Sequence, residues 1–154
     1  MKLKGELKLN ANVKATLRDA KTGRIKEVSL YHNVVPTIGR TAIANAMTDT
    51  GPSPGALVTY CEVGTGITTP ATSDIALTTP LFRATVASRS NDGNIAYVTG
   101  FFPSTEANGN LKEAGLFCGG TATAGTGSMI SHVLVNITKS VSETLTIEWL
   151  FQID

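Results

Sequence analysis

The feature that most limits the fold of this chain is a strict alternation of apolar and polar side chains in several segments. In residues 143–154 every second side chain is apolar, and this row consists of Leu145, Ile147, Trp149, Phe151 and Ile153. Residues 6–20 and 129–137 have the same period. Because successive side chains of a β-strand point to opposite faces, this period predicts strands with one face in a hydrophobic core. Trp149 is therefore expected in the core.

Turn signals divide the chain into about eight such strands. The expected strands are residues 6–20, 24–35, 56–63, 81–90, 94–102, 111–117, 129–137 and 143–154. Turn residues at 19–23 and 91–93 predict two hairpins, one over residues 6–35 and one over residues 81–102. Residues 36–51 instead have apolar side chains at helical spacing, which predicts one short helix with Thr37 as its N-cap.

Many short strands and one helix indicate an all-β fold, either an antiparallel β-sandwich or a jelly-roll-like barrel with one short α-helix. A length of 154 residues fits one domain. We assign residues 11–154 to a single β-sandwich domain and residues 1–10 to an N-terminal arm. Leu3, Leu7 and Leu9 of the arm are spaced between polar residues, so the arm is expected to add as an edge strand to a partner.

The low charge of the chain argues against several classes of function. Charged residues make up 16% of the sequence, below the roughly 25% of an average globular protein, and the formal net charge is +1. We expect no nucleic-acid partner, since such a partner requires a clustered basic surface. No apolar run has the length of a membrane span and residues 1–6 lack the apolar core of a secretory signal, so we expect no membrane partner and folding in a cytosol.

Few residues are of the types that carry chemistry. Cys61 and Cys118 lie in apolar surroundings and are predicted to be buried free thiols, with a bridge between them as the alternative. His32 and His132 are the only histidines. Neither has a cysteine or carboxylate at metal-ligand spacing, so both are interpreted as surface or interface residues. We predict no catalytic residues, no metal site and no cofactor.

The segment Gly64-Thr65-Gly66 follows an apolar strand, as the glycines of phosphate-binding loops do. Such a loop needs a helix N-terminus behind it, because the exposed backbone amides bind the anion. Residues 67–70 have the sequence Ile-Thr-Thr-Pro, which is extended rather than helical. The sequence therefore predicts a turn or bulge in which both glycines adopt positive φ.

Two acidic residues, Glu62 and Glu113, lie within strands that are otherwise mainly apolar. A buried carboxylate is costly unless it is paired. Arg83 and Lys139 lie near apolar strand segments and are the candidate partners, so we predict structural ion pairs within the fold or across a subunit contact. The alternative is an acid and base pair for glycoside hydrolysis.

Several short motifs occur in a fixed order. They are residues 33–40 (NVVPTIGR), residues 62–66 (EVGTG) followed by Pro70, Asp74, Leu77 and Arg83, residues 101–117 (FFPSTEANGNLKEAGLF) and residues 137–149 (ITKSVSETLTIEW). In this order the chain resembles a group of small, β-rich structural proteins of tailed bacteriophages. The resemblance covers roughly residues 12–153, so the arm lies outside it. The positions that match its motifs, and that it implies are architectural, are Gly64, Gly66, Asp74, Arg83, Glu113, Gly115 and Lys139.

The resemblance implies a non-enzymatic virion protein that assembles in the host cytoplasm. We expect a capsid decoration (cement) protein that forms homo-oligomers, trimers by preference, and binds the major capsid protein or other virion proteins. A tail, baseplate or fibre-attachment protein is the alternative. A carbohydrate-binding or hydrolytic β-sandwich is a more distant one, since the expected burial of Trp149 removes the usual aromatic platform for a sugar.

Overall fold

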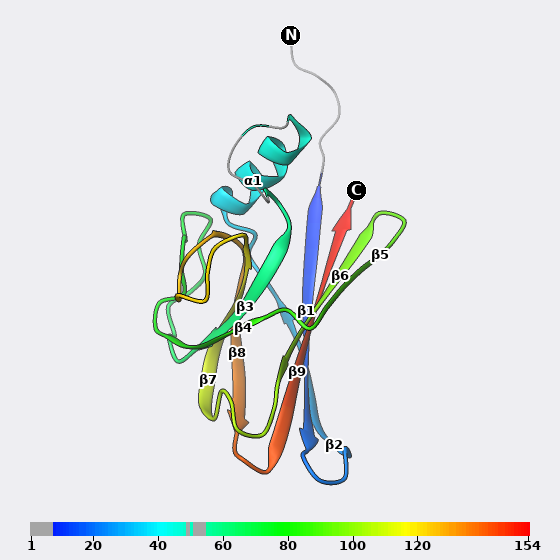
Figure 1. Cartoon of the computed structure of the whole chain (residues 1–154), viewed down its shortest axis with the longest axis vertical. Helices are drawn as coiled ribbons and strands as arrows, with labels where there is room; N and C mark the ends of the chain where they lie inside the picture. The colour runs from blue at the N-terminus through cyan, green and yellow to red at the C-terminus, as the bar shows by residue number, and fades with distance from the viewer. Residues whose placement is uncertain (1–7, 49, 51–54) are drawn as a thin grey trace.

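The computed structural model describes residues 8–48, 50 and 55–154 of the chain. These residues form nine strands and one helix (Figure 1). The elements are β1 (Leu9–Asp19), β2 (Ile25–His32), α1 (Thr37–Met47), β3 (Val58–Gly64), β4 (Pro80–Thr85), β5 (Ser88–Asp92), β6 (Ile95–Phe102), β7 (Gly109–Cys118), β8 (Ser128–Lys139) and β9 (Glu143–Ile153). They confirm the predicted all-β fold with a single short helix.

Two antiparallel sheets pack face to face. The five-stranded sheet has the order β2-β1-β9-β6-β5, and the four-stranded sheet has the order β4-β3-β7-β8. Side chains from the facing sides of both sheets form one core, in which Val13 and Trp149 from one sheet meet Leu111 and Val133 from the other. The Trp149 side chain is fully buried, as its place in an alternating row predicts.

The first strand begins earlier than the predicted domain boundary at residue 11. Leu9 and Asn10 are part of β1 and pair with Ile153 and Gln152 of β9 in the same chain. Leu9 also packs against the main core. Leu3 and Leu7, the other two apolar residues of the predicted arm, lie outside the described residues.

The expected strand over residues 81–90 is two strands in two different sheets. The amide of Val86 donates to the carbonyl of Thr59 in β3, at 3.0 Å, whereas the next amide, that of Ala87, donates to the carbonyl of Thr99 in β6, at 2.7 Å. The chain therefore crosses from the four-stranded to the five-stranded sheet between these two residues. Alternation of side chains cannot reveal such a crossing, because the strands on either side have the same period.

Helix α1 lies at one end of the sandwich and packs on β8 (Figure 1). Its N-cap is Pro36 rather than the predicted Thr37, which is the first helical residue, and no side chain caps the helix there. Gly39 allows the close packing, since a Cβ at this position would lie 2.6 Å from the Met129 carbonyl oxygen. Among the described residues, no helix has the length and apolar character needed to span a membrane.

Candidate functional site

A second apolar layer lies on the outer side of the four-stranded sheet, away from the main core. Leu77, Phe117 and Met129 are its buried members, and Ile38 and Tyr60 pack against them. The loops after β3 and after β7 lie over this side of the sheet, on the side away from β1 and β9 (Figure 1). Of the charged residues predicted as a site, Glu62, Arg83 and Glu113 lie beneath and beside these loops, whereas Lys139 contacts the loop after β6.

Glu62 and Arg83 are neighbours on β3 and β4, because the register of the two strands places them directly opposite each other. The Arg83 Nη1 atom lies 2.8 Å from Glu62 Oε2, and the two side chains are 3% and 0% exposed. The guanidinium also lies between two rings, 4.6 Å from the Tyr60 centroid and 4.5 Å from the Phe117 centroid. Ion pairing and ring stacking together hold a buried cation in place.

Arg83 also binds the loop that connects β7 to β8. Its Nε donates to the Thr121 carbonyl at 3.0 Å, and its Nη2 donates to the Thr126 carbonyl at 2.6 Å. The amide of Gly125 in the same loop donates to Glu62 Oε2 at 3.2 Å. The ion pair thus fixes the loop from residue 119 to 127.

Glu113 on β7 performs the same task for the loop between β3 and β4. Its carboxylate is fully buried and accepts hydrogen bonds from the backbone amides of Gly66, Thr78 and Thr79, at 3.1, 3.0 and 2.7 Å. It does not meet Lys139. Its charged partner among the described residues is His132, whose Nε2 lies 3.0 Å from Glu113 Oε2.

The interpretation of His132 as a surface or interface residue is wrong. Its side chain is 1% exposed, and its Nδ1 lies 2.7 Å from Asp74 Oδ2 while its Nε2 faces Glu113. An ionised carboxylate only accepts hydrogen bonds, so both contacts form together when the ring carries two protons. His32, in contrast, is exposed. The sequence holds one signal for this contact. His132 lies in an apolar strand, and Glu113 is an acid in another apolar strand that needs a partner.

Asp74 completes this cluster at the loop surface. Desolvation raises the pKa of its carboxyl group, but the hydrogen bonds from the Ala71 amide and from His132 outweigh that effect and leave the pKa below its ordinary value. Asp74 therefore stays ionised, and the row of Asp74, His132 and Glu113 ties the loop to β7 and β8.

Gly64 and Gly66 do not adopt the positive φ that the sequence predicts. They are glycines because there is no space for a side chain. A Cβ on Gly64 would lie 2.7 Å from Glu113 Oε1, and a Cβ on Gly66 would lie 2.7 Å from both the Glu113 Cδ and the Thr78 Cβ atoms. The segment that resembles a phosphate loop is therefore a cradle for a protein carboxylate.

Lys139 is buried among backbone oxygens instead of pairing with a predicted glutamate. Its Nζ donates to the carbonyls of Pro103 and Glu106 and to Asn108 Oδ1, each at 2.8 Å. Burial lowers the pKa of the ammonium group below its ordinary value. The loop bends closely around this group, and Ala107 within it has a φ of 53°, a conformation that is costly for a residue with a side chain.

Both cysteines are free and buried, as predicted. Burial raises the pKa of the Cys61 and Cys118 thiols to about 12 in each case, so neither is a ready nucleophile.

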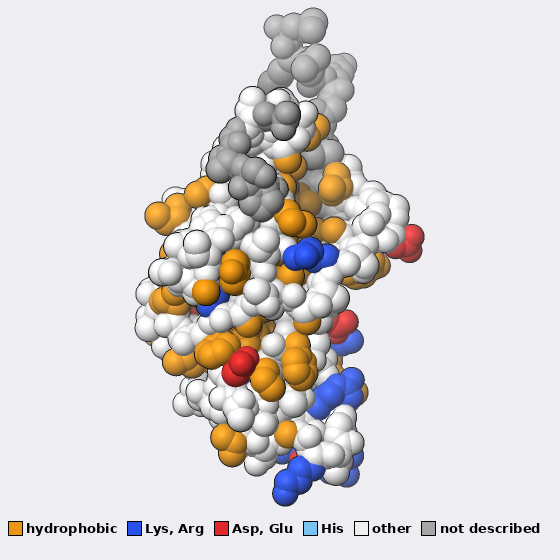
Figure 2. All heavy atoms as spheres, in the orientation of Figure 1, with side chains coloured by type: hydrophobic (Ala, Val, Ile, Leu, Met, Phe, Trp, Pro, Cys, Tyr) orange, Lys and Arg blue, Asp and Glu red, His pale blue; other side chains and the backbone are white. Residues whose placement is uncertain are grey.

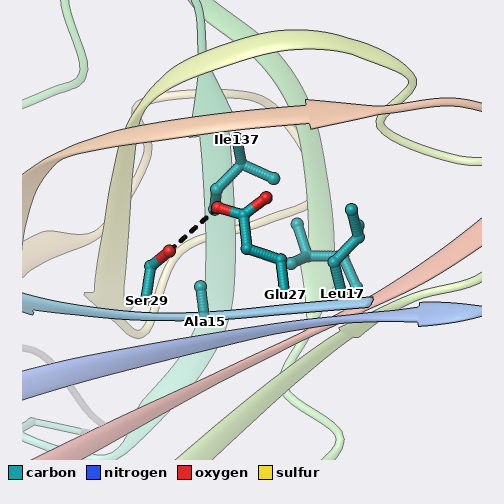
Figure 3. A pocket seen from close by; sticks show the side chains of 6 residues that line it. Ala15, Leu17, Glu27, Ser29 and Ile137 are labelled. Atoms are coloured by element: carbon teal, nitrogen blue, oxygen red, sulfur yellow. Dashed lines mark hydrogen bonds between the residues drawn. The ribbon is translucent and has the colours of Figure 1, made fainter. Parts of the chain in front are cut away.

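A narrow gap between β2 and β8 exposes Glu27 and Ser29, which share a 3.0 Å hydrogen bond beside Ile137 (Figure 3). This gap has no room for a water-sized molecule. An acid at the inner side of an edge strand discourages further strand pairing there.

The buried charges therefore organise loops, and within the described part of the chain their hydrogen bonds run mainly to backbone groups and to one another. No group of three or more histidine, cysteine, aspartate or glutamate residues is placed to hold a metal ion in the described residues. Comparison of the chain with protein-family profiles, with curated protein sequences and with solved structures finds no match.

Proposed function

We propose that this protein is a non-enzymatic structural protein of a tailed bacteriophage virion, and specifically a capsid decoration protein that forms small homo-oligomers. The virion assignment rests on the order of sequence motifs described above. The assembly role also draws on the surface of the sandwich. The use of buried charges to hold loops is consistent with a role that depends on shape rather than on catalysis.

The observation that carries the assembly role is the outer face of the five-stranded sheet. Val28 and Leu30 on β2 are 48% and 77% exposed, and Tyr97 and Phe101 on β6 are 38% and 44% exposed. We call these four residues, with Lys14 and Glu148 between them, the outer sheet face. The strand register sets Leu30 beside Lys14 and Lys14 beside Glu148, which puts the charged pair between the two apolar edges.

The outer sheet face suits contact with a second copy of the chain. Lys14 Nζ lies 3.3 Å from Glu148 Oε2, and each side chain is 49% exposed. A neighbouring copy can place its own acid against Lys14 and its own base against Glu148, so the face is complementary in charge to itself. Five strands about 4.8 Å apart form a face of roughly 600 Å², and two such faces bury roughly 1,200 Å², the lower limit for a specific interface.

One face of the molecule carries few charged side chains. In the view of Figure 2 they are sparse, and the blue side chains are most frequent toward the end where β1 turns into β2. The exposed bases Lys21 and Arg24 belong to this turn. A surface of low charge supports extensive protein contacts, since the cores of protein interfaces are depleted of charged residues.

The test is to locate the protein in particles. Phage particles released by the bacterium that encodes the chain are purified, quantified by mass spectrometry and labelled with an antibody against the protein. We expect many copies per particle, with label on the head. Label confined to the tail or baseplate would favour the alternative of a tail, baseplate or fibre-attachment protein. Absence from purified particles would overturn the virion assignment.

One observation supports the more distant alternative of a carbohydrate-binding sandwich. Tyr97 and Phe101 are exposed on the same face of one strand, whereas Trp149 is buried and cannot touch a glycan. A glycan array decides this alternative. Binding that is lost in a folded Tyr97→Ala variant would favour it, and an array without binding would exclude it.

A further inference from the structure

The pairing of β2 with β1 stops before β1 does. Within the described residues the register ends at Asn12 and His32, although β1 continues back to Leu9. Lys8 exchanges two 2.8 Å backbone hydrogen bonds with Asp154. In an antiparallel pair, residues that hydrogen-bond to the neighbouring strand alternate with residues whose backbone groups point away from it. Leu9 follows Lys8, so it directs its N–H and C=O away from β9, toward the side where β2 no longer pairs.

The chain leaves β1 because Val34 pairs with the opposite sheet. The amide of Val34 donates to the His132 carbonyl at 2.9 Å, and the His132 amide donates to the Val34 carbonyl at 3.0 Å. Since neighbouring residues of an extended segment point their backbone groups to opposite sides, Asn33 and Val35 direct theirs away from β8. Two backbone edges are thus exposed where β2 parts from β1.

A pocket of about 480 Å³ lies at this place. It falls in the size range of ligand sites in proteins, roughly 300–1,000 Å³. We call it the end pocket. Its lining residues are Lys8, Leu9, Asn10, Asn33, Val34, Val35, Arg40, Ile43, Thr72 and Ile153. In Figure 1 the start of β1, the end of β9 and α1, which carry many of these residues, meet at one end of the sandwich.

The lining of the end pocket combines apolar and cationic groups. Leu9, Val35 and Ile43 also pack against the main core, so they provide an apolar surface continuous with it. Lys8 and Arg40 supply positive charge, and both are exposed. The nearby Asp154 side chain accepts a hydrogen bond from Asn10 Nδ2 at 2.8 Å and does not line the pocket, so Lys8 and Arg40 are the charged residues of the lining within the described residues.

Asn33 supplies the polar group that most requires a partner. Its Nδ2 donates to Ser131 Oγ at 2.7 Å, which fixes the orientation of the amide. Its Oδ1 is buried and has no hydrogen-bond partner among the described residues. An unsatisfied buried acceptor costs stability, but this oxygen is closed to solvent and a bound segment would not reach it as the pocket stands.

We propose that the end pocket binds an extended segment of a partner protein in which acidic residues flank one apolar side chain. The backbone of the segment adds as a short strand to the exposed edge at Leu9. Its apolar side chain contacts Val35 and Ile43, and its carboxylates meet Lys8 and Arg40. Strand addition supplies affinity through backbone hydrogen bonds, and pocket contacts supply specificity.

This inference deepens the proposed function, on which it rests, because it assigns the kind of segment by which a virion partner would be held. The two can fail separately. Particle labelling tests where the protein works, whereas a peptide titration of the purified chain tests the end pocket alone.

The titration uses the pentapeptide acetyl-Thr-Glu-Val-Glu-Thr-amide and its counterpart with lysine in place of both glutamates. Backbone amide shifts of the isotopically labelled protein are followed by NMR. We expect saturable shifts at Leu9, Asn33 and Val35 with the acidic peptide, and at least tenfold weaker binding of the basic peptide. Arg40→Ala should weaken binding of the acidic peptide by about tenfold.

The matched control is Arg24→Ala, which removes an exposed base from the β1–β2 turn at the other end of the molecule and should leave the affinity unchanged. Equal binding of both peptides, shifts remote from the pocket, or no shifts at millimolar peptide would overturn the proposal. So would binding that appears only after residues 1–7 are deleted, since the pocket would then belong to the chain's own N-terminal segment.

Discussion

Arg83 is the residue on which most contacts of the four-stranded sheet converge. Its guanidinium meets the Glu62 carboxylate, two backbone carbonyls and two aromatic rings. An acid in an apolar strand was enough to predict that Glu62 needs a cation, because an unpaired buried charge is costly. The enclosure by Tyr60 and Phe117 was beyond prediction, since it depends on the register of three strands.

Replacement of Arg83 by alanine should lower the free energy of unfolding by about 3–5 kcal/mol, because Glu62 is then buried without its partner. Urea titration measures the loss. Arg24→Ala is the exposed control and should change stability by less than about 0.5 kcal/mol. The double variant Glu62→Gln/Arg83→Met removes both charges and should recover part of the loss. A single variant as stable as the parent would contradict the role given to the pair.

Gly66→Ala should destabilise the protein by about 1–3 kcal/mol, since the added methyl group enters the space of Glu113 and Thr78. Thr65→Ala, at the exposed neighbouring position, is the control and should be nearly neutral. Urea midpoints of the two variants give the comparison. If Gly66→Ala is also neutral, crowding by Glu113 and Thr78 is not the reason for a glycine at this position.

At the scale of elements, alternation located the strands well but did not place them in sheets. The rows of β1 and β9 are visible in the sequence because only one face of each is buried. The crossing between β4 and β5 is not visible, nor is the β7–β8 register, which pairs Gly115 with His132 and so sets Glu113 and His132 on the same side of the sheet. Paired residues 19 positions apart leave no periodic signal.

The β8–β9 turn contains a pH-sensitive contact. Glu143 accepts hydrogen bonds from Lys26 Nζ at 2.8 Å and from the Ser140 side chain and amide at 2.7 Å. The Lys26 bond, then those from Ser140, lower the pKa of Glu143 from 4.5 to about 2. A carboxyl group whose pKa is lower in the folded than in the unfolded chain stabilises the fold at pH values above its unfolded-state pKa. This contribution is lost as the pH falls from about 4.5 to about 2.

Glu143→Gln should therefore be less stable than the parent by about 1 kcal/mol at pH 7, and the difference should shrink as the pH falls through this interval. Thermal unfolding at a series of pH values measures it. Asp92→Asn, at the exposed end of β5, controls for the loss of a surface carboxylate. A stability difference that is constant down to pH 2 would show that the carboxylate charge is not its source.

At the scale of the whole molecule, three loops are each held by one buried charged residue. Arg83 fixes the loop after β7, Glu113 fixes the loop after β3, and Lys139 fixes the loop after β6. Each uses a charged side chain to satisfy backbone groups that would otherwise be unpaired away from water. The loops are therefore held to the sandwich by buried charges, and the outer sheet face is the surface proposed for assembly.

The assembly role predicts that single lysine substitutions on the outer sheet face separate the copies. Leu30→Lys and Phe101→Lys should each separate the copies that pair through this face, because each places an unpaired charge in an apolar contact. Ile67→Lys is the matched control, since Ile67 is 78% exposed but lies in the loop after β3, and it should keep the parent mass. Light scattering after size-exclusion chromatography measures the masses, and circular dichroism verifies that each variant is folded.

Lys14→Glu should also weaken assembly, and Lys14→Glu/Glu148→Lys should restore it if the two charges meet across copies. A parent that is monomeric even at high protein concentration, or lysine variants of parent mass, would exclude this face as the interface.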